Sequence, residues 1–235
     1  MIHYRPLGPI AAISFDLDDT LYDNRPVIQA AEDKLYAWLA ERVKLREDSR
    51  SYFQQWRQRV LKEKPALRHD ATASRHQALL LGLKALGVPQ AQVLADAAMG
   101  HFLAWRSEGD IAPEVHQMLA YLSGRRPLIA ISNGNADVER LGLGQYFKAS
   151  FHAGGSRRMK PDPDLFVAAA QHLKLTPKAI LHIGDHLDDD IQGALLAGYQ
   201  AAWYNPKGHS LRQHPRGRLL PHFEFGALDS LQQLL

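Results

Sequence analysis

Short apolar runs separated by polar, helix-like stretches set the pattern of this chain. The runs lie at residues 10–15, 127–131, 149–152, 179–183 and 200–204. Brief continuous apolar runs are typical of strands in a parallel sheet that is covered on both faces. Because helix-like stretches alternate with the runs after residue 111, the pattern predicts an α/β fold built on a parallel sheet.

A long helical region interrupts this alternation after the first predicted strand. Apolar residues such as Ala31, Leu35 and Leu39 recur at helical spacing. The stretches with this character are 27–44, 49–62, 72–86 and 90–106. We therefore predict an all-helical cap domain at residues 23–109, inserted into a sheet domain formed by residues 1–22 and 110–235. The two chain crossings would then form a hinge near Tyr22 and Asp110.

Composition narrows the class of protein. The 235 residues are 46% hydrophobic and 23% charged, as in an ordinary globular protein, and the formal charge is only +3. A charge this small favours anionic small molecules over nucleic acid as partners. The absence of cysteine excludes disulfides, thiolate catalysis and thiolate metal sites. Residues 1–9 lack an apolar signal core and no run is long enough to span a bilayer, so we expect a cytoplasmic protein without a membrane partner.

Three of the predicted strands end in groups that suit phosphate chemistry. The first strand leads into Asp16-Leu17-Asp18-Asp19-Thr20, the second into Ser132-Asn133-Gly134, and the fourth into Gly184-Asp185. In open parallel sheets, ligands bind beyond the carboxyl ends of the strands. Carboxylates that are crowded together repel one another, and a cation or a set of hydrogen-bond donors is the usual remedy.

Each of these residue types has a role if a phosphate monoester is cleaved. Asp16, nearest the strand, is the candidate nucleophile that attacks phosphorus and forms an aspartyl-phosphate. Asp18 would protonate the leaving alkoxide and then activate water for the second step. Asp16 and Asp185 would hold Mg²⁺, which prefers hard oxygen ligands. Ser132, with neighbouring backbone N–H groups, and Lys160 would bind the phosphoryl oxygens.

The same motifs, in the same order, resemble the haloacid dehalogenase superfamily. The matching segments are Asp16-Leu17-Asp18-Asp19-Thr20, Ser132-Asn133, Lys160-Pro161 and Gly184-Asp185 followed by Asp189-Asp190. The resemblance implies a Rossmann-like, three-layer α/β/α core with a helical cap inserted after the first motif. It also implies that Asp18 gives its backbone carbonyl to Mg²⁺ and that Asn133 joins the phosphate site. An acidic residue at Asp189 or Asp190 would support the metal or Lys160, and Asp190 matches the family's spacing best.

Segments outside these motifs indicate a substrate. Residues 4–8, 21–28 and 218–222 are similar to bacterial members of the superfamily that hydrolyse flavin mononucleotide (FMN) and the riboflavin precursor 5-amino-6-(5-phospho-D-ribitylamino)uracil. The resemblance implies a Mg²⁺-dependent phosphatase for one of these small phosphomonoesters. A phosphatase or phosphomutase for another sugar phosphate or nucleotide is an alternative, and so is a non-catalytic sensor of phosphorylated ligands. A dehalogenase is disfavoured because cleavage of a carbon–halogen bond does not need the acid/base Asp18.

Overall fold

A single mostly parallel sheet organises the molecule. The computed structural model describes residues 1–45, 48–211 and 219–234, so the resemblance segment 218–222 begins outside the described residues. In the described part of the chain, seven strands take the order β1-β7-β6-β5-β2-β3-β4. The strands are β1 (Ile2–His3), β2 (Ala12–Phe15), β3 (Leu128–Ser132), β4 (Phe147–His152), β5 (Ile180–Gly184), β6 (Gln200–Tyr204) and β7 (Phe223–Phe225). All neighbours are parallel except β1 with β7, an antiparallel edge that the sequence pattern did not predict.

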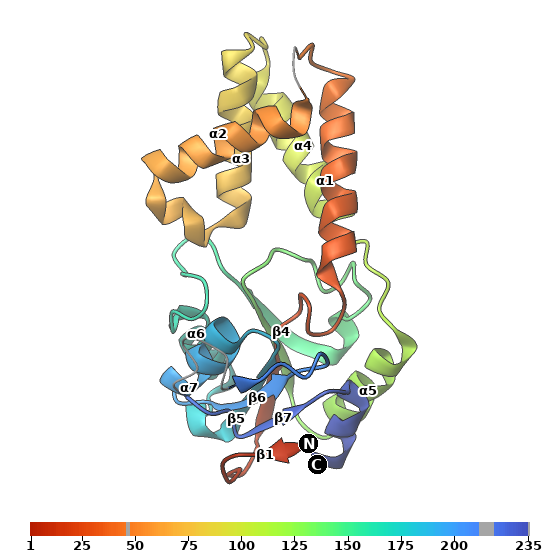
Figure 1. The fold of residues 1–235 in the computed structure, drawn as a ribbon, viewed down its shortest axis with the longest axis vertical. Coiled ribbons are helices and arrows are strands. Elements are labelled where there is room, and N and C mark those ends of the chain that lie inside the picture. The colour runs from red at the N-terminus through yellow and green to blue at the C-terminus, as the bar shows by residue number, and fades with distance from the viewer. Residues whose placement is uncertain (46–47, 212–218, 235) are drawn as a thin grey trace.

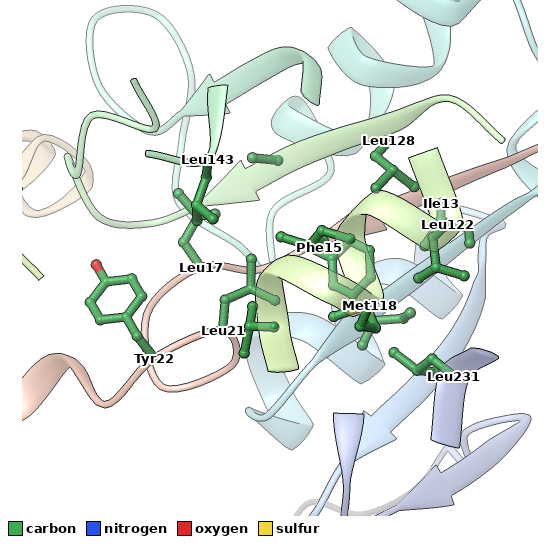
Figure 2. Close-up of a cluster of buried hydrophobic side chains, with 14 of the residues drawn as sticks. Ile13, Phe15, Leu17, Leu21, Tyr22, Met118, Leu122, Leu128, Leu143 and Leu231 are labelled. Carbon is green, nitrogen blue, oxygen red and sulfur yellow. The ribbon is translucent and has the colours of Figure 1, made fainter. Parts of the chain in front are cut away.

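Helices cover both faces of this sheet and confirm the predicted three-layer α/β fold. On one face, Ile13 and Phe15 pack in a cluster with Met118 of α5 (Pro113–Ser123), as Figure 2 shows. On the other face, Ala12 belongs to a cluster with Phe166 of α6 (Asp164–Leu173), and α7 (Gly193–Leu196) joins it. Alternate β2 residues therefore serve opposite cores, as a doubly covered strand requires. Burial of each large apolar side chain contributes about 1.5–3 kcal/mol.

Between β2 and α5, the described residues form four helices in a separate layer, which stands away from the sheet in Figure 1. They are α1 (Asn24–Ala40), α2 (Ser49–Glu63), α3 (Ala71–Ala85) and α4 (Ala91–Trp105). The first three begin at an aspartate whose side chain accepts a backbone N–H of the first turn, which stabilises the helix start. Leu35, Leu39, Phe53, Leu83 and Phe102 form part of the core of this layer.

Shorter turns complete the described chain. The 3₁₀ turns lie at Pro65–His69, Gly144–Tyr146, Pro177–Ala179 and Leu228–Leu234. A π-helical turn, Leu187–Gln192, follows β5 and carries Asp189 and Asp190, the two acidic residues singled out by sequence. Among the described residues, no helix combines the length and the apolar character that a membrane crossing needs.

Candidate active site

The carboxyl ends of β2, β3 and β5 meet near the centre of the sheet and border a cavity. Phe15 of β2 pairs with Ala130 of β3 and Ile183 of β5, so the residues that follow these strands come together. The cavity has a volume of about 170 Å³, and its lining comprises Asp16, Asp18, Asp19, Ser132, Asn133, Gly134, Lys160, Asp185, His186, Asp189 and Asp190. Every site residue that the sequence predicts therefore borders one cavity.

The ammonium group of Lys160 is buried in this site and uses all its donors. The residue is only 3% exposed. Its Nζ donates to Asp16 Oδ1 at 2.7 Å, to Asp190 Oδ1 at 2.6 Å and to the backbone carbonyl of Ile131 at 2.7 Å. Burial opposes its charge, but the two carboxylates raise the pKa of Lys160 above its ordinary value. Lys160 is therefore charged at neutral pH.

Asp190 is the acidic residue of the π-helical turn that contacts Lys160. Its Oδ1 also lies 3.3 Å from His182 Nε2, and its Oδ2 accepts the backbone N–H of His186 at 2.9 Å. Burial acts to raise the pKa of Asp190, but Lys160 and His182 hold it below its ordinary range. Both oxygens of this buried carboxylate are thus satisfied by protein groups.

Asp16 and Asp185 face each other beside the hydroxyl of Thr20. Thr20 Oγ1 lies 3.4 Å from Asp16 Oδ2 and 3.2 Å from Asp185 Oδ1. Burial, followed by the charge of Asp190, raises the pKa of Asp185 to about 6. Burial also raises the pKa of Asp16, and Lys160 opposes that shift. Oxygens of Asp16, Asp185 and Asp190 all lie within 4.8 Å of one another, so this group could hold a metal ion.

The carboxylate of Asp18 is bound by two side chains from outside the sequence motifs. The Tyr22 hydroxyl donates to its Oδ1, and Nη2 of Arg106 donates to its Oδ2. Arg106 also donates from Nη1 to the Tyr22 hydroxyl at 3.1 Å and from Nε to Asn135 Oδ1 at 2.8 Å. Side chains thus bind both carboxylate oxygens of Asp18, and Asp18 is not part of the oxygen group formed by Asp16, Asp185 and Asp190.

Ser132 and Asn133 organise the loop after β3. Ser132 Oγ accepts the backbone N–H of Gly134 at 2.9 Å. The side chain of Asn133 spans the backbone of Lys160, because Oδ1 accepts its N–H at 2.7 Å and Nδ2 donates to its carbonyl at 3.0 Å. Nδ2 also lies 3.3 Å from Asp189 Oδ2. The Asn133 side chain thus positions Lys160 and does not point freely into the cavity.

Sequence reasoning missed Tyr22, Arg106 and Asn135 as site residues. Tyr22 follows Asp18 by four positions, which was a usable signal. Arg106 stands 88 positions from Asp18, and only the fold brings the two together. Of the two histidines near Asp185 in the sequence, His182 is fully buried and His186 is exposed.

Comparison with known proteins gives concordant results. The family model of haloacid dehalogenase-like hydrolases matches residues 10–198. The 5-amino-6-(5-phospho-D-ribitylamino)uracil phosphatase YigB of Escherichia coli K12 is 41% identical over 238 residues, covering 100% of both chains. The glyceraldehyde 3-phosphate phosphatase of Methanopyrus kandleri is 27% identical and covers 80% of this chain and 81% of its own.

A solved structure extends the likeness to three dimensions. A protein described as 2-haloacid dehalogenase from Pseudomonas syringae pv. tomato DC3000 is 39% identical, with a TM-score of 0.86. The match covers 96% of this chain and 97% of that one. Sequence, fold and the order of the motifs around the cavity lead to one conclusion. This chain belongs to the haloacid dehalogenase-like hydrolases.

Proposed function

We propose that this protein hydrolyses small phosphomonoesters through a phosphorylated Asp16. The observation that carries the proposal is the setting of this carboxylate at the end of β2. Lys160 binds Oδ1 of Asp16 at 2.7 Å, while Oδ2 has a long contact of 3.4 Å with Thr20 that a ligand can replace. A carboxylate so fixed, beside a buried cation and at a cavity, suits attack on an anionic phosphoryl group.

The proposed reaction has two steps. In the first, an oxygen of Asp16 bonds to phosphorus, the bond from phosphorus to the ester oxygen breaks, and Asp18 gives that oxygen a proton. In the second, Asp18 takes a proton from water, whose oxygen bonds to phosphorus and frees Asp16 and inorganic phosphate. One carboxyl group serves both steps because the proton it loses in the first is regained in the second.

The remaining cavity residues would bind the phosphoryl group. Lys160 supplies a fixed positive charge, and Ser132 offers a hydroxyl at the end of β3. We assign the phosphate contact of Asn133 to its backbone, since its side chain is bound to Lys160. Asp190 would hold Lys160 through its ion pair with the ammonium group, and Asp189 would hold Asn133 by accepting a hydrogen bond from its side-chain amide.

The atoms in this site that could bind a metal ion fit Mg²⁺. All are oxygens, and both oxygens of Asp190 are already bound by protein groups, which leaves the carboxylates of Asp16 and Asp185. Their raised pKa values reflect burial that an added cation would offset. Asp16, Asp185 and the backbone carbonyl of Asp18 would hold Mg²⁺, which offsets the negative charge of a bound phosphoryl group.

We propose 5-amino-6-(5-phospho-D-ribitylamino)uracil or FMN as the substrate. The support is the full-length likeness to the Escherichia coli phosphatase at 41% identity. The Pseudomonas syringae protein of similar identity is described as a dehalogenase. We favour a phosphatase because Asp18 lies two residues beyond Asp16 and provides the acid/base that an alkoxide leaving group needs.

We further propose that residues 1–22 and 110–235 form the catalytic domain and that residues 23–109 form a cap over its cavity. The separate hydrophobic core of the helical region supports this division, and contacts around the start of α3 support the position of the cap beside the cavity. The backbone N–H of Met159 donates to His69 Nδ1 at 3.2 Å, beside Lys160. The side chain of Asn135 donates to Thr72 at 2.9 Å. The helical region thus touches the loops that form the site.

A phosphate-release screen tests the proposed function. Purified protein is assayed with and without Mg²⁺ on FMN, the ribitylaminouracil phosphate and common sugar phosphates. We expect Mg²⁺-dependent release, abolished in Asp16→Asn and retained in the control Asp162→Asn, whose carboxylate pairs with Arg158 on the surface. Full activity of Asp16→Asn would reject the mechanism. Chloride release from 2-chloropropionate without any phosphate release would instead identify a dehalogenase.

A further inference from the structure

The two oxygens of the Asp18 carboxylate are each bound by a different side chain, and those side chains are bound to each other. Tyr22 donates to Oδ1 and Arg106 to Oδ2, while Arg106 Nη1 donates to the Tyr22 hydroxyl at 3.1 Å. Asn135 accepts from Arg106 Nε at 2.8 Å. We call Tyr22 and Arg106 the Asp18 clamp. A carboxylate held at both oxygens has little freedom to rotate.

Burial makes this arrangement well defined. Arg106 is only 2% exposed, and a buried guanidinium is tolerated only where carboxylates and other acceptors surround it. Gly134 packs directly against this pair and leaves no room for a side chain, because a Cβ at this position would lie 2.2 Å from Asp18 Oδ2 and 2.8 Å from Arg106 Nη2. The ring of Tyr22 is anchored in the hydrophobic cluster, and Figure 2 shows its hydroxyl directed away from that cluster.

The Asp18 clamp comes from the connections between the sheet and the helical region. Tyr22 lies just before α1, and Arg106 directly follows α4. Asn135, which accepts from Arg106, donates to Thr72 at the start of α3. The position of Asp18 is therefore linked to the two chain segments that adjoin α1 and α4 and, through Arg106 and Asn135, to α3.

We propose that Arg106 and Tyr22 are positioning residues that set the carboxylate of Asp18 for proton transfer and tie its position to the helical region. This inference rests on the proposed function, in which Asp18 protonates the leaving oxygen. Proton donation matters for an alkoxide such as that of the ribityl chain, which is a poor leaving group. A p-nitrophenolate ion leaves without a proton. Loss of positioning should therefore slow alkyl esters and spare the aryl ester.

The test compares two substrates in a single turnover with enzyme in excess. Riboflavin release from FMN and p-nitrophenol release from p-nitrophenyl phosphate both report the first chemical step alone. For FMN, we expect a decrease of about tenfold in Tyr22→Phe and about a hundredfold in Arg106→Lys, within the range of general-acid effects. Asp18→Asn should decrease it at least as much. For p-nitrophenyl phosphate, each variant should stay within about threefold of the natural protein, because this leaving group needs no acid.

Two control variants remove similar buried groups elsewhere. Tyr199→Phe deletes a buried hydroxyl that donates to the carbonyl of Phe166 at 2.6 Å. Arg75→Lys alters a buried guanidinium that donates to Glu32 at 2.6 Å. Any effect of these controls should fall equally on both substrates, so the ratio of the two rates should not change. Thermal unfolding of each variant checks the fold, and Tyr22→Phe remains informative if Arg106→Lys does not fold.

The possible outcomes separate the inference from the function on which it rests. The ratio that decides is the rate on FMN divided by the rate on p-nitrophenyl phosphate. If this ratio is unchanged in folded Tyr22→Phe and Arg106→Lys but lowered in Asp18→Asn, the positioning role alone is overturned. An unchanged ratio in Asp18→Asn would remove the acid role of Asp18 and the inference with it. Turnover by Asp16→Asn would reject the proposed mechanism itself.

Discussion

Replacement of Lys160 by Met should destabilise the metal-free protein strongly. The change removes three hydrogen bonds and leaves the carboxylates of Asp16 and Asp190 buried without their cation. Breaking a buried ion pair by removing one partner costs about 3–5 kcal/mol. The orphaned carbonyl of Ile131 adds to the cost, and the apolar side chain of Met recovers part of it. We therefore expect the free energy of unfolding to fall by about 3–5 kcal/mol at pH 8.

The pH dependence of this loss follows from the pKa of Asp16. Burial raises that pKa in the folded state, and in Lys160→Met no ammonium opposes the shift. A carboxyl group with a raised folded pKa costs stability above that pKa, and the cost disappears below its unfolded value. In the natural protein, Asp190 has a lowered pKa, so its stabilising effect persists from pH 8 down to pH 5. The destabilisation by Lys160→Met should therefore be smaller at pH 5 than at pH 8.

Urea unfolding in EDTA, followed by tryptophan fluorescence, measures both effects. Lys148→Met serves as the control because this lysine is exposed, and surface substitutions change stability by about 0.5 kcal/mol or less. A loss below about 1 kcal/mol for Lys160→Met at pH 8 would refute the electrostatic reasoning. A loss that grows as the pH falls would do so as well.

Three further substitutions give separate tests. Asp185→Asn should stabilise the metal-free protein by about 1 kcal/mol at pH 7.5 but not below pH 4, because a pKa of about 6 makes the ionised form of Asp185 costly in the folded state. Thermal melts in EDTA measure this change, and melts in Mg²⁺ should show that the variant is no longer stabilised by the ion. Gly82→Ala would place a Cβ 2.8 Å from Phe53 and should lower unfolding stability by about 1–2 kcal/mol in urea titrations. Gly134→Ala should displace the carboxylate of Asp18 and reduce kcat on FMN at least about tenfold.

The sheet was predictable because its strands are continuous apolar runs whose ends carry polar groups. The strands β2, β3, β5 and β6 lie within a residue or two of their predicted bounds. The helices α1 to α4 were predictable from apolar residues that recur at helical spacing. The strands β1 and β7, which end one side of the sheet, were not predictable, because each is two or three residues long and their pairing joins residues from opposite ends of the chain.

The site was predictable where its residues follow strands, and less so where the fold alone brings them together. Asp16, Ser132 and Asp185 follow from strand order. The choice of Asp190 as the contact of Lys160 depends on the π-helical turn, which directs Asp190 inward and leaves Asp189 partly exposed. The contact of Arg106 with Asp18 joins residues 88 positions apart, and no local pattern encodes it.

Phosphorylation of Asp16 is the central claim, and acid-quenched samples test it most directly. Asp18→Asn is mixed with p-nitrophenyl phosphate and Mg²⁺, since this variant should complete the first step and stall before water attacks. We predict a burst of p-nitrophenol equal to the enzyme concentration and a peptide containing Asp16 that has gained the mass of one phosphoryl group. Release of nitrophenol and phosphate at equal rates, with no burst and no modified peptide, would contradict the account.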